Sequence, residues 1–186
     1  ATAAQAEEIL NMAKEKQVFI TEAIWTRYMP LSKTINELMD SGVIGEPKML
    51  SANLGYPIGH KERMLRPELA GGALLDLGVY PINFAFMTFG SDIKETVSTC
   101  VKTDTGMDAQ ESMIFVYNDG RVAVLHSSMW AKTDRQCIIS GTEGHLIVEN
   151  CNNPQRVTVV DSEYNVIARY DAPAQITGYE YQVYAC

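Results

Sequence analysis

The sequence predicts an α+β fold in which helices cover one face of a large, open and mostly antiparallel sheet. Two observations carry this prediction. Over the first 90 residues, helical patterns alternate with single strand-like runs, whereas from Ile93 onward seven strand-like segments follow one another across short turns. Strands joined by short turns pair antiparallel, and the apolar face of such a sheet has to be buried against another layer.

The composition is that of a folded globular protein. A length of 186 residues suits one domain, or one domain with part of a second, and 46% hydrophobic with 20% charged residues argues against disorder. A formal net charge of −8 repels phosphate backbones and disfavours a nucleic-acid partner. The uninterrupted apolar runs are shorter than the ~20 residues of a membrane span, so no membrane is expected. The four cysteines lack the spacing of a metal or redox site, which favours free thiols and a cytoplasmic location.

The first segment predicts half of an α/β unit. Residues 2–17 form an amphipathic helical pattern that Thr2 can cap, and the apolar run at 18–23 is of strand type. No strand precedes this helix in the sequence, and no signal peptide pattern opens it. We therefore expect the chain to begin inside a larger domain.

The middle of the chain predicts a second helix, a strand and a loop. Pro30 opens a helix with an apolar stripe that ends at 40–42, and a turn then leads into a strand over 48–54. Residues 56–68 have no period and are predicted to form a loop of a length that often carries function.

The segment 71–80, GGALLDLGVY, combines two glycines, an apolar run, one carboxylate and one phenol. In a helix, Asp76 and Tyr80 share one face, and the glycines allow another backbone or a ligand to come close. The surrounding leucines would bury most of this helix, which we expect to reach about residue 88 with a kink or a new first turn at Pro81. A buried Asp and Tyr either brace a neighbouring loop or form the polar floor of a substrate pocket, and the pattern alone does not choose between the two.

The second half of the chain predicts a series of strands. Asn118-Asp119-Gly120 is a strong hairpin signal, and the opening of a helix follows at 178–182 and ends abruptly at Cys186. The expected strands are 93–103, 109–117, 120–130, 135–140, 145–149, 156–161 and 165–170.

The order of motifs resembles one known family. E-A-x-W-x-R-x-x-P at 22–30, G-x-I-G-x-P at 42–47, GGALLDLGVY at 71–80 and the turn GTEG at 141–144 follow one another as in the Gfo/Idh/MocA oxidoreductases. The tyrosine-bearing motif and the Trp25 segment are most similar to the dihydrodiol (and D-xylose) dehydrogenase-like branch. The resemblance covers essentially the whole chain.

This resemblance implies a domain organisation. Members have an N-terminal Rossmann domain that binds NAD or NADP, followed by an α/β domain whose open sheet covers the active site on one side and commonly mediates oligomerisation on the other. Two hallmarks are absent here, the G-x-G-x-x-G turn and the E-K-P motif whose lysine belongs to the catalytic set. We therefore expect 1–23 to be the last helix and strand of the Rossmann domain. Residues 24–186 would be the substrate-binding and oligomerisation domain, truncated at its C-terminus. The cofactor would be bound mainly by the missing domain, and the fragment alone would be inactive.

The resemblance also assigns two catalytic candidates. Tyr80 matches the family's proton donor or acceptor, since a carbonyl that receives hydride becomes an alkoxide and needs a proton. Asp76 matches a motif position that hydrogen-bonds a substrate hydroxyl or orients the tyrosine, and a helix-to-loop brace is an equal alternative.

Four further residues are candidates for substrate binding. Trp25 offers a flat apolar wall and Arg27 a fork of donors at the domain junction, although junction packing and a plain salt bridge are the alternatives. Tyr56 and Arg63 lie in the loop before the helix, where a solvated loop is the alternative. No residue is assigned to cofactor phosphates or to a metal.

Two functions of different classes follow. The first is an NAD(P)-dependent oxidoreductase that transfers hydride between nicotinamide and a sugar-like or cyclic diol substrate, assembled as a homo-oligomer through the open sheet. The second is a non-catalytic module that senses a nucleotide or sugar, or that assembles through its sheet.

Overall fold

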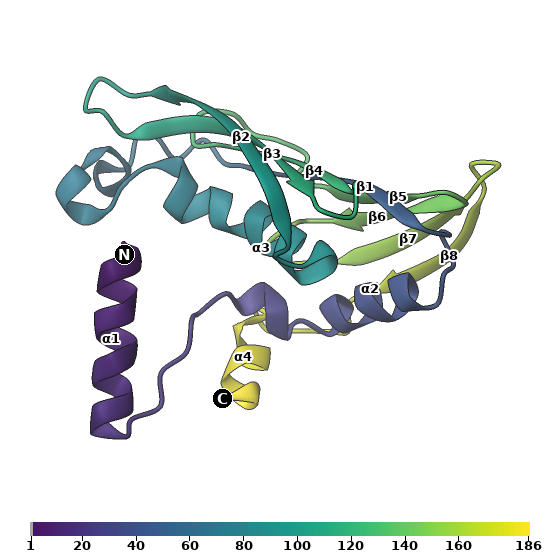
Figure 1. The fold of residues 1–186 in the computed structure, drawn as a ribbon, viewed down its shortest axis with the longest axis horizontal. Helices are drawn as coiled ribbons and strands as arrows, with labels where there is room; N and C mark the ends of the chain where they lie inside the picture. The colour runs from purple at the N-terminus through teal and green to yellow at the C-terminus, as the bar shows by residue number, and fades with distance from the viewer. Residues whose placement is uncertain (1) are drawn as a thin grey trace.

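The chain forms one eight-stranded sheet with helices on a single face. The computed structural model describes residues 2–186, and its strand order is β2-β3-β4-β1-β5-β6-β7-β8 (Figure 1). Within this part of the chain β1 pairs parallel with β4, and the other neighbouring pairs are antiparallel. The predicted α+β class is confirmed. The strands are β1 (Pro47–Gly55), β2 (Ile93–Lys102), β3 (Asp108–Tyr117), β4 (Val122–Ser128), β5 (Cys137–Gly141), β6 (Gly144–Glu149), β7 (Arg156–Asp161) and β8 (Val166–Asp171).

The position of β1 was not predicted. It lies between β4 and β5, so the two halves of the β-rich region are joined through a strand that precedes both in sequence. The alternation of β1 marks it as a strand, but it does not specify its partners.

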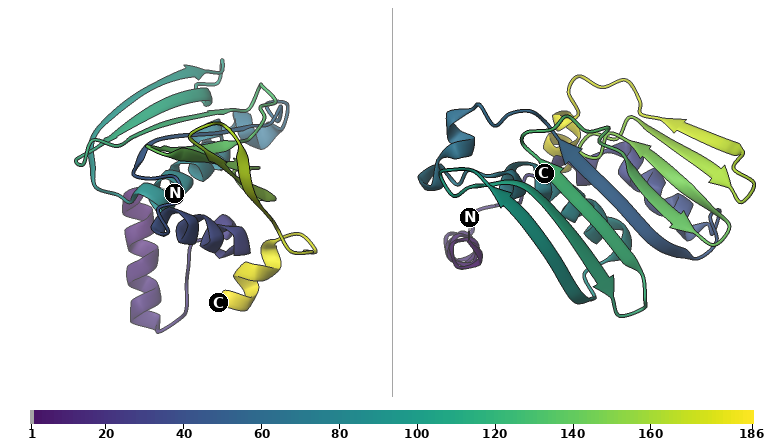
Figure 2. Two further views of the ribbon diagram at one scale, coloured as in Figure 1. Left: turned by 90° about the vertical axis from the view of Figure 1, so that its right-hand side faces the viewer. Right: turned by 90° about the horizontal axis from the view of Figure 1, so that it is seen from above.

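The helices under the sheet form the core with it. Leu31 and Ile35 of α2 (Pro30–Asp40) and Phe84 of α3 (Val79–Phe89) are buried against the strands. Figure 1 shows both helices on the same side of the sheet, and Figure 2 shows the opposite face from above with no helix of the described chain across it. The predicted helix of Pro30 and its apolar stripe are confirmed.

The first helix, α1 (Ala3–Lys16), lies apart from the sheet (Figure 1). Its predicted N-cap is confirmed, because Thr2 Oγ1 accepts from the Gln5 backbone N–H at 3.3 Å and Gln5 Oε1 accepts from the Thr2 N–H at 2.8 Å. Ala13 is its buried residue, so the apolar face of the helix is mostly exposed.

The strand predicted at 18–23 is wrong. These residues have no ladder partner among residues 2–186 and form no strand, and Phe19 is 74% exposed. An apolar run of strand type indicates a tendency to be buried, but a strand also needs a neighbour for its backbone groups.

The helix predicted over 71–88 is present with a different geometry. Residues Leu74–Gly78 (η4) form a π-helical turn that passes directly into α3, and Pro81 is the third residue of α3. Near Pro81 the helix changes from π to α geometry, and it does not start anew there. The expectation that the leucines bury most of the helix is wrong for Leu75, which is 49% exposed.

By length and composition alone, one helical stretch is apolar enough to cross a membrane. It runs from Pro67 to Phe89, beyond the short runs seen in the sequence, and half of its most apolar window is buried in the protein. Packing of this stretch beneath the sheet explains its apolar character.

Candidate functional site

The site is organised by η4 and the first turn of α3, which carry Asp76 and Tyr80. The glycine pair brings this segment against its neighbours. A Cβ on Gly71 would lie 2.6 Å from the Arg63 carbonyl oxygen, and Gly72 has φ +96° and faces the Asp108 carboxylate. The prediction that the glycines admit close approach is confirmed, and the approaching groups are a backbone and a carboxylate.

Tyr80 is held by a tryptophan from another element. The indole Nε1–H of Trp25, on the short 3₁₀ helix η1 (Trp25–Tyr28), donates to Tyr80 Oη at 3.1 Å. Trp25 is only 5% exposed. Burial raises the pKa of the Tyr80 phenol, the Trp25 hydrogen bond opposes this, and the nearby acidic groups of Tyr179, Asp76 and Tyr56 raise the pKa further. The described residues therefore keep Tyr80 as a neutral phenol.

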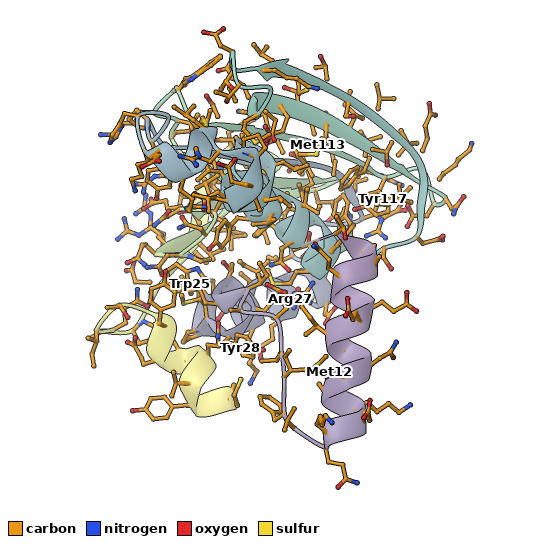
Figure 3. The ribbon with its side chains drawn as sticks, turned by 90° about the vertical axis from the view of Figure 1, so that its left-hand side faces the viewer. Met12, Trp25, Arg27, Tyr28, Met113 and Tyr117 are labelled. Carbon is orange, nitrogen blue, oxygen red and sulfur yellow. The ribbon has the colours of Figure 1, made fainter. Side chains whose placement is uncertain are left out.

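Tyr179 completes the aromatic wall beside Tyr80. Its ring stacks on Trp25 with a centroid distance of 4.2 Å and an interplanar angle of 25°. It is the first residue of α4 (Tyr179–Ala185), whose start is fixed by Glu180, which accepts from the Ile176 and Gly178 backbone N–H groups at 2.6 and 2.7 Å. These bonds lower the pKa of the Glu180 carboxyl to about 2, against the effect of desolvation. Figure 3 shows Trp25 close to this helix.

Sequence reasoning predicted the helix at 178–182 but did not place it in the site. The contact joins residues more than 150 positions apart, and no local pattern reports it. The one signal in the sequence was Gly178, directly before Tyr179. The structure shows its role, because a Cβ at Gly178 would lie 2.8 Å from Trp25 Cζ3.

Asp76 braces the loop that precedes its helix. Its Oδ1 accepts from Arg63 Nη2 on η2 (Glu62–Leu65), which joins two of the predicted residues in an ion pair. The Asp76 side chain is 28% exposed and that of Arg63 is 50% exposed, so the pair borders solvent. The bracing contact is present, and the distance from Asp76 to Tyr80 is short enough for its charge to act on the phenol.

Tyr56 lies near Tyr80, whereas Arg27 bonds to a residue one turn further along α3. Tyr56 Oη accepts from Arg135 Nη1 at 2.6 Å, and its ring lies 5.2 Å from the Arg135 guanidinium carbon, close enough to Tyr80 to affect that phenol. Arg27 Nε donates to Asn83 Oδ1 at 2.5 Å, one turn along α3 from Tyr80. The structure thus brings Trp25, Tyr56, Asp76 and Tyr80 together with Arg63 behind Asp76. It directs Arg27 to the next turn.

The sheet supports η4 from behind through residues that sequence reasoning missed. Asp108 Oδ2 of β3 accepts from the Leu74 N–H at 2.5 Å, and the buried Glu111 accepts from Ser127 Oγ of β4. Burial raises the pKa of Glu111 to about 7. The hydrogen bond from Ser127 lowers this pKa, and the charge of Asp108 raises it further. An acidic residue at an inward strand position was the available signal.

The glycine-rich start of η4 does not form a cradle for a dinucleotide, and the described residues show no metal site. The glycine-rich start of η4 is closed by the Asp108 carboxylate, which would repel a phosphate placed there. Among residues 2–186, no group of three or more His, Cys, Asp or Glu side chains is arranged to hold a metal ion.

Comparison with known proteins defines the class. Residues 32–147 match the family model described as GFO/IDH/MocA C-terminal domain. The chain belongs to the Gfo/Idh/MocA family, and the resemblance drawn from its motifs is confirmed.

Individual relatives fall in the expected branch. The chain is 37% identical to trans-1,2-dihydrobenzene-1,2-diol dehydrogenase of Xenopus tropicalis, in an alignment that covers 76% of this chain and 43% of that protein. It is 35% identical to D-xylose 1-dehydrogenase (NADP(+)) of Hypocrea jecorina, over 79% of this chain and 44% of the other. The chain spans about half the length of the curated relatives it matches.

Solved structures share the fold. A 3-ketoreductase from Actinomadura kijaniata, solved in complex with NADP and TDP-benzene, superposes with a TM-score of 0.88 over 98% of this chain and 57% of that one, at 23% identity. The aldose-aldose oxidoreductase from Caulobacter crescentus, complexed with glycerol, gives a TM-score of 0.84 at 19% identity over 97% of this chain and 56% of that one.

Proposed function

We propose that the full-length protein is an NAD(P)-dependent oxidoreductase that transfers hydride between nicotinamide and a C–OH group of a sugar-like or cyclic diol substrate. In this proposal Tyr80 carries the proton. The observation that supports it most directly is the hydrogen bond from Trp25 Nε1–H to Tyr80 Oη, made beside Asp76 on the helix that bears the family motif. The activities named for the dehydrogenase relatives support the same reaction class.

The Trp25 contact orients the Tyr80 hydroxyl. A phenol has one hydrogen to donate and lone pairs to accept, and the indole N–H can only donate. Because Trp25 occupies an acceptor position, the Tyr80 O–H is left to point elsewhere. During carbonyl reduction it would donate to the alkoxide that forms on the substrate, and the indole N–H would then stabilise the phenolate left behind.

The residues around Tyr80 favour its neutral form. Burial and the acidic neighbours raise its pKa, so proton donation is favoured over proton abstraction unless a cation is added. We expect that cation to be the lysine of the E-K-P motif implied by the family resemblance.

NAD(P) would supply the hydride chemistry when bound, mainly by the N-terminal domain that we expect beyond these residues. Asp108 occupies the start of η4, so this helix start would not bind the cofactor phosphates. The contribution of this chain would instead be the aromatic wall of Trp25 and Tyr179 and the proton relay. The fragment alone is therefore expected to be inactive.

A substrate panel with the full-length protein tests the proposal. We expect NAD- or NADP-dependent turnover of at least one sugar or cyclic diol, measured as absorbance of the reduced nicotinamide. Binding of the cofactor without turnover of any panel member would instead favour the non-catalytic sensor.

We also propose that the open face of the sheet joins two copies of the protein. One row of residues that crosses the strands on this face is largely apolar, and each residue of the row is the register partner of the next. Val97 is 51% and Ile114 39% exposed there. A continuous apolar face of this kind on a monomer usually marks an interaction site. The row consists of Val97, Ile114, Val124, Ser51, Ile138, Ile147 and Thr158.

Substituting Ile114→Lys tests this interface. A buried, unpaired charge within a shared face should weaken the dimer by at least about tenfold, so sedimentation at micromolar concentration should show dimer for the wild type and monomer for the variant. Thr105→Lys, in the exposed turn between β2 and β3, is the matched control and should remain dimeric. A wild-type protein that sediments as a monomer would contradict the proposal.

A further inference from the structure

Two carboxyl groups of the same strand hold η4 from the sheet side. Residues three apart on a regular strand point to opposite faces, yet Asp108 and Glu111 of β3 both reach η4. The register between β2 and β3 shifts between Val101 and Lys102, which leaves Ala109 as an extra residue in β3. This bulge turns Asp108 to the same side as Glu111.

The Glu111 contact lies at the end of η4 that leads to Tyr80. A Cβ on Gly78 would lie 2.7 Å from Glu111 Oε1 and 3.0 Å from Ser127 Oγ, so only a glycine lets the helix rest on this pair. Glu111 is 6% exposed and Ser127 2%. Oε1 accepts from Ser127, whereas Oε2 has no hydrogen-bond partner among the described residues.

The groups that face Glu111 do not favour its charge. The nearby charged group on β3 itself is Asp108. The residues paired with Glu111 on the neighbouring strands are the neutral Ser127 of β4 and Cys100 of β2, which carries a thiol. Leu74 and Gly78 of η4 are apolar. A buried carboxyl with these neighbours is stable when neutral, and its raised pKa agrees with this.

We propose that Glu111 is a positioning residue that, through Gly78 and Ser127, sets the π-helical turn and thereby the placement of Asp76 and Tyr80. The catalytic meaning of this placement rests on the oxidoreductase proposed above, but the structural coupling does not. Gly78, Val79 and Tyr80 are consecutive, so a displacement of Gly78 is transmitted to the phenol along the helix.

Ionisation of Glu111 provides the displacement. A cavity of about 290 Å³ adjoins the carboxyl and is lined by Leu74 of η4 together with Cys100, Asp108 and Met113. Oε2 is inaccessible to solvent, so water or donors can reach a carboxylate there only by displacing groups packed around it, and Leu74 and Gly78 of η4 are among these groups. We expect η4 to move away from β3 and the hydrogen bond between Trp25 and Tyr80 to lengthen.

The test follows the Trp25 indole ¹H–¹⁵N resonance of the full-length protein from about pH 5.5 to about pH 8.5. We expect it to titrate with a midpoint near pH 7 in the wild type and to stay constant in Glu111→Gln. Trp130, which packs on Gly59, is the internal control and should not follow this titration. Trp25→Phe assigns the signal.

A second variant keeps the proposal testable if Glu111→Gln does not fold. Ser127 stabilises the carboxylate, so Ser127→Ala should move the midpoint to higher pH. A Trp25 signal that does not titrate in the wild type, or that titrates unchanged in Glu111→Gln or Ser127→Ala, would overturn the proposal. If the Trp25 titration behaves as expected but no substrate turns over, the positioning role stands and the oxidoreductase proposal fails.

Discussion

Tyr80→Phe is expected to reduce turnover of the full-length protein by a factor of about 10² to 10⁴, the usual contribution of a positioned general acid. The ring remains, so packing on α3 and beside Trp25 is kept, and only the proton and the acceptor for the Trp25 N–H are lost. Loss of that one hydrogen bond should cost about 1 kcal/mol of stability. The measurement is kcat with the best substrate of the panel, together with a thermal unfolding curve.

Tyr179→Phe is the matched control for this experiment. It removes a hydroxyl from the neighbouring ring that stacks on Trp25, and the stacking itself remains. We expect kcat to change by less than about threefold, because Tyr179 is not assigned a proton. Undiminished turnover in Tyr80→Phe would remove Tyr80 from the mechanism, and an equal loss in both variants would show that the effect is not specific to the Tyr80 proton.

The stability of the protein is expected to fall as the pH rises from about 5 to 8, by on the order of 3 kcal/mol from Glu111 alone. The folded-state pKa of Glu111 is about 7, against an ordinary value of 4.5. Between these values the folded state holds a proton that the unfolded state has released, so raising the pH favours unfolding. Below the ordinary value both states are protonated and the full stability is present, and above the folded-state value the loss is complete.

Urea unfolding of wild type and Glu111→Gln at several pH values measures this effect. The amide cannot ionise, so the slope assigned to Glu111 should vanish, even if the buried amide shifts stability by a constant amount. Glu8→Gln, on the exposed surface of α1, is the control and should keep the wild-type slope. The groups whose pKa is lowered, such as Asp119 and Glu180, change stability on the acid side of this window. Equal slopes in Glu111→Gln and wild type would refute the assignment.

Much of the fold could be predicted from local patterns. The N-cap of α1, Pro30 at the start of α2 and the Asn118-Asp119-Gly120 hairpin are local signals, and the elements they predict are present. The run at 18–23 shows the limit of such patterns, because a strand depends on a partner that the run does not contain.

The candidate site could be predicted only in part. The motif spacing placed Tyr80 and Asp76 on one helix, and the tertiary structure then added Trp25 and Tyr179 to Tyr80 and Arg63 to Asp76. Glu111 was missed because an isolated glutamate in a strand pattern is usually taken to face solvent.

The sequence by itself determined most of the segments that are helices and strands, the family, and the helix that carries the phenol. Spacing, caps and turn residues act within a few positions, so one chain is enough to show them. Only the tertiary structure decided that β1 enters the middle of the sheet, that η4 adopts a π turn over Glu111, and that Arg27 binds Asn83 instead of joining Tyr80. These outcomes depend on groups distant in sequence competing for the same buried space, and such competition is resolved only when the chain is packed.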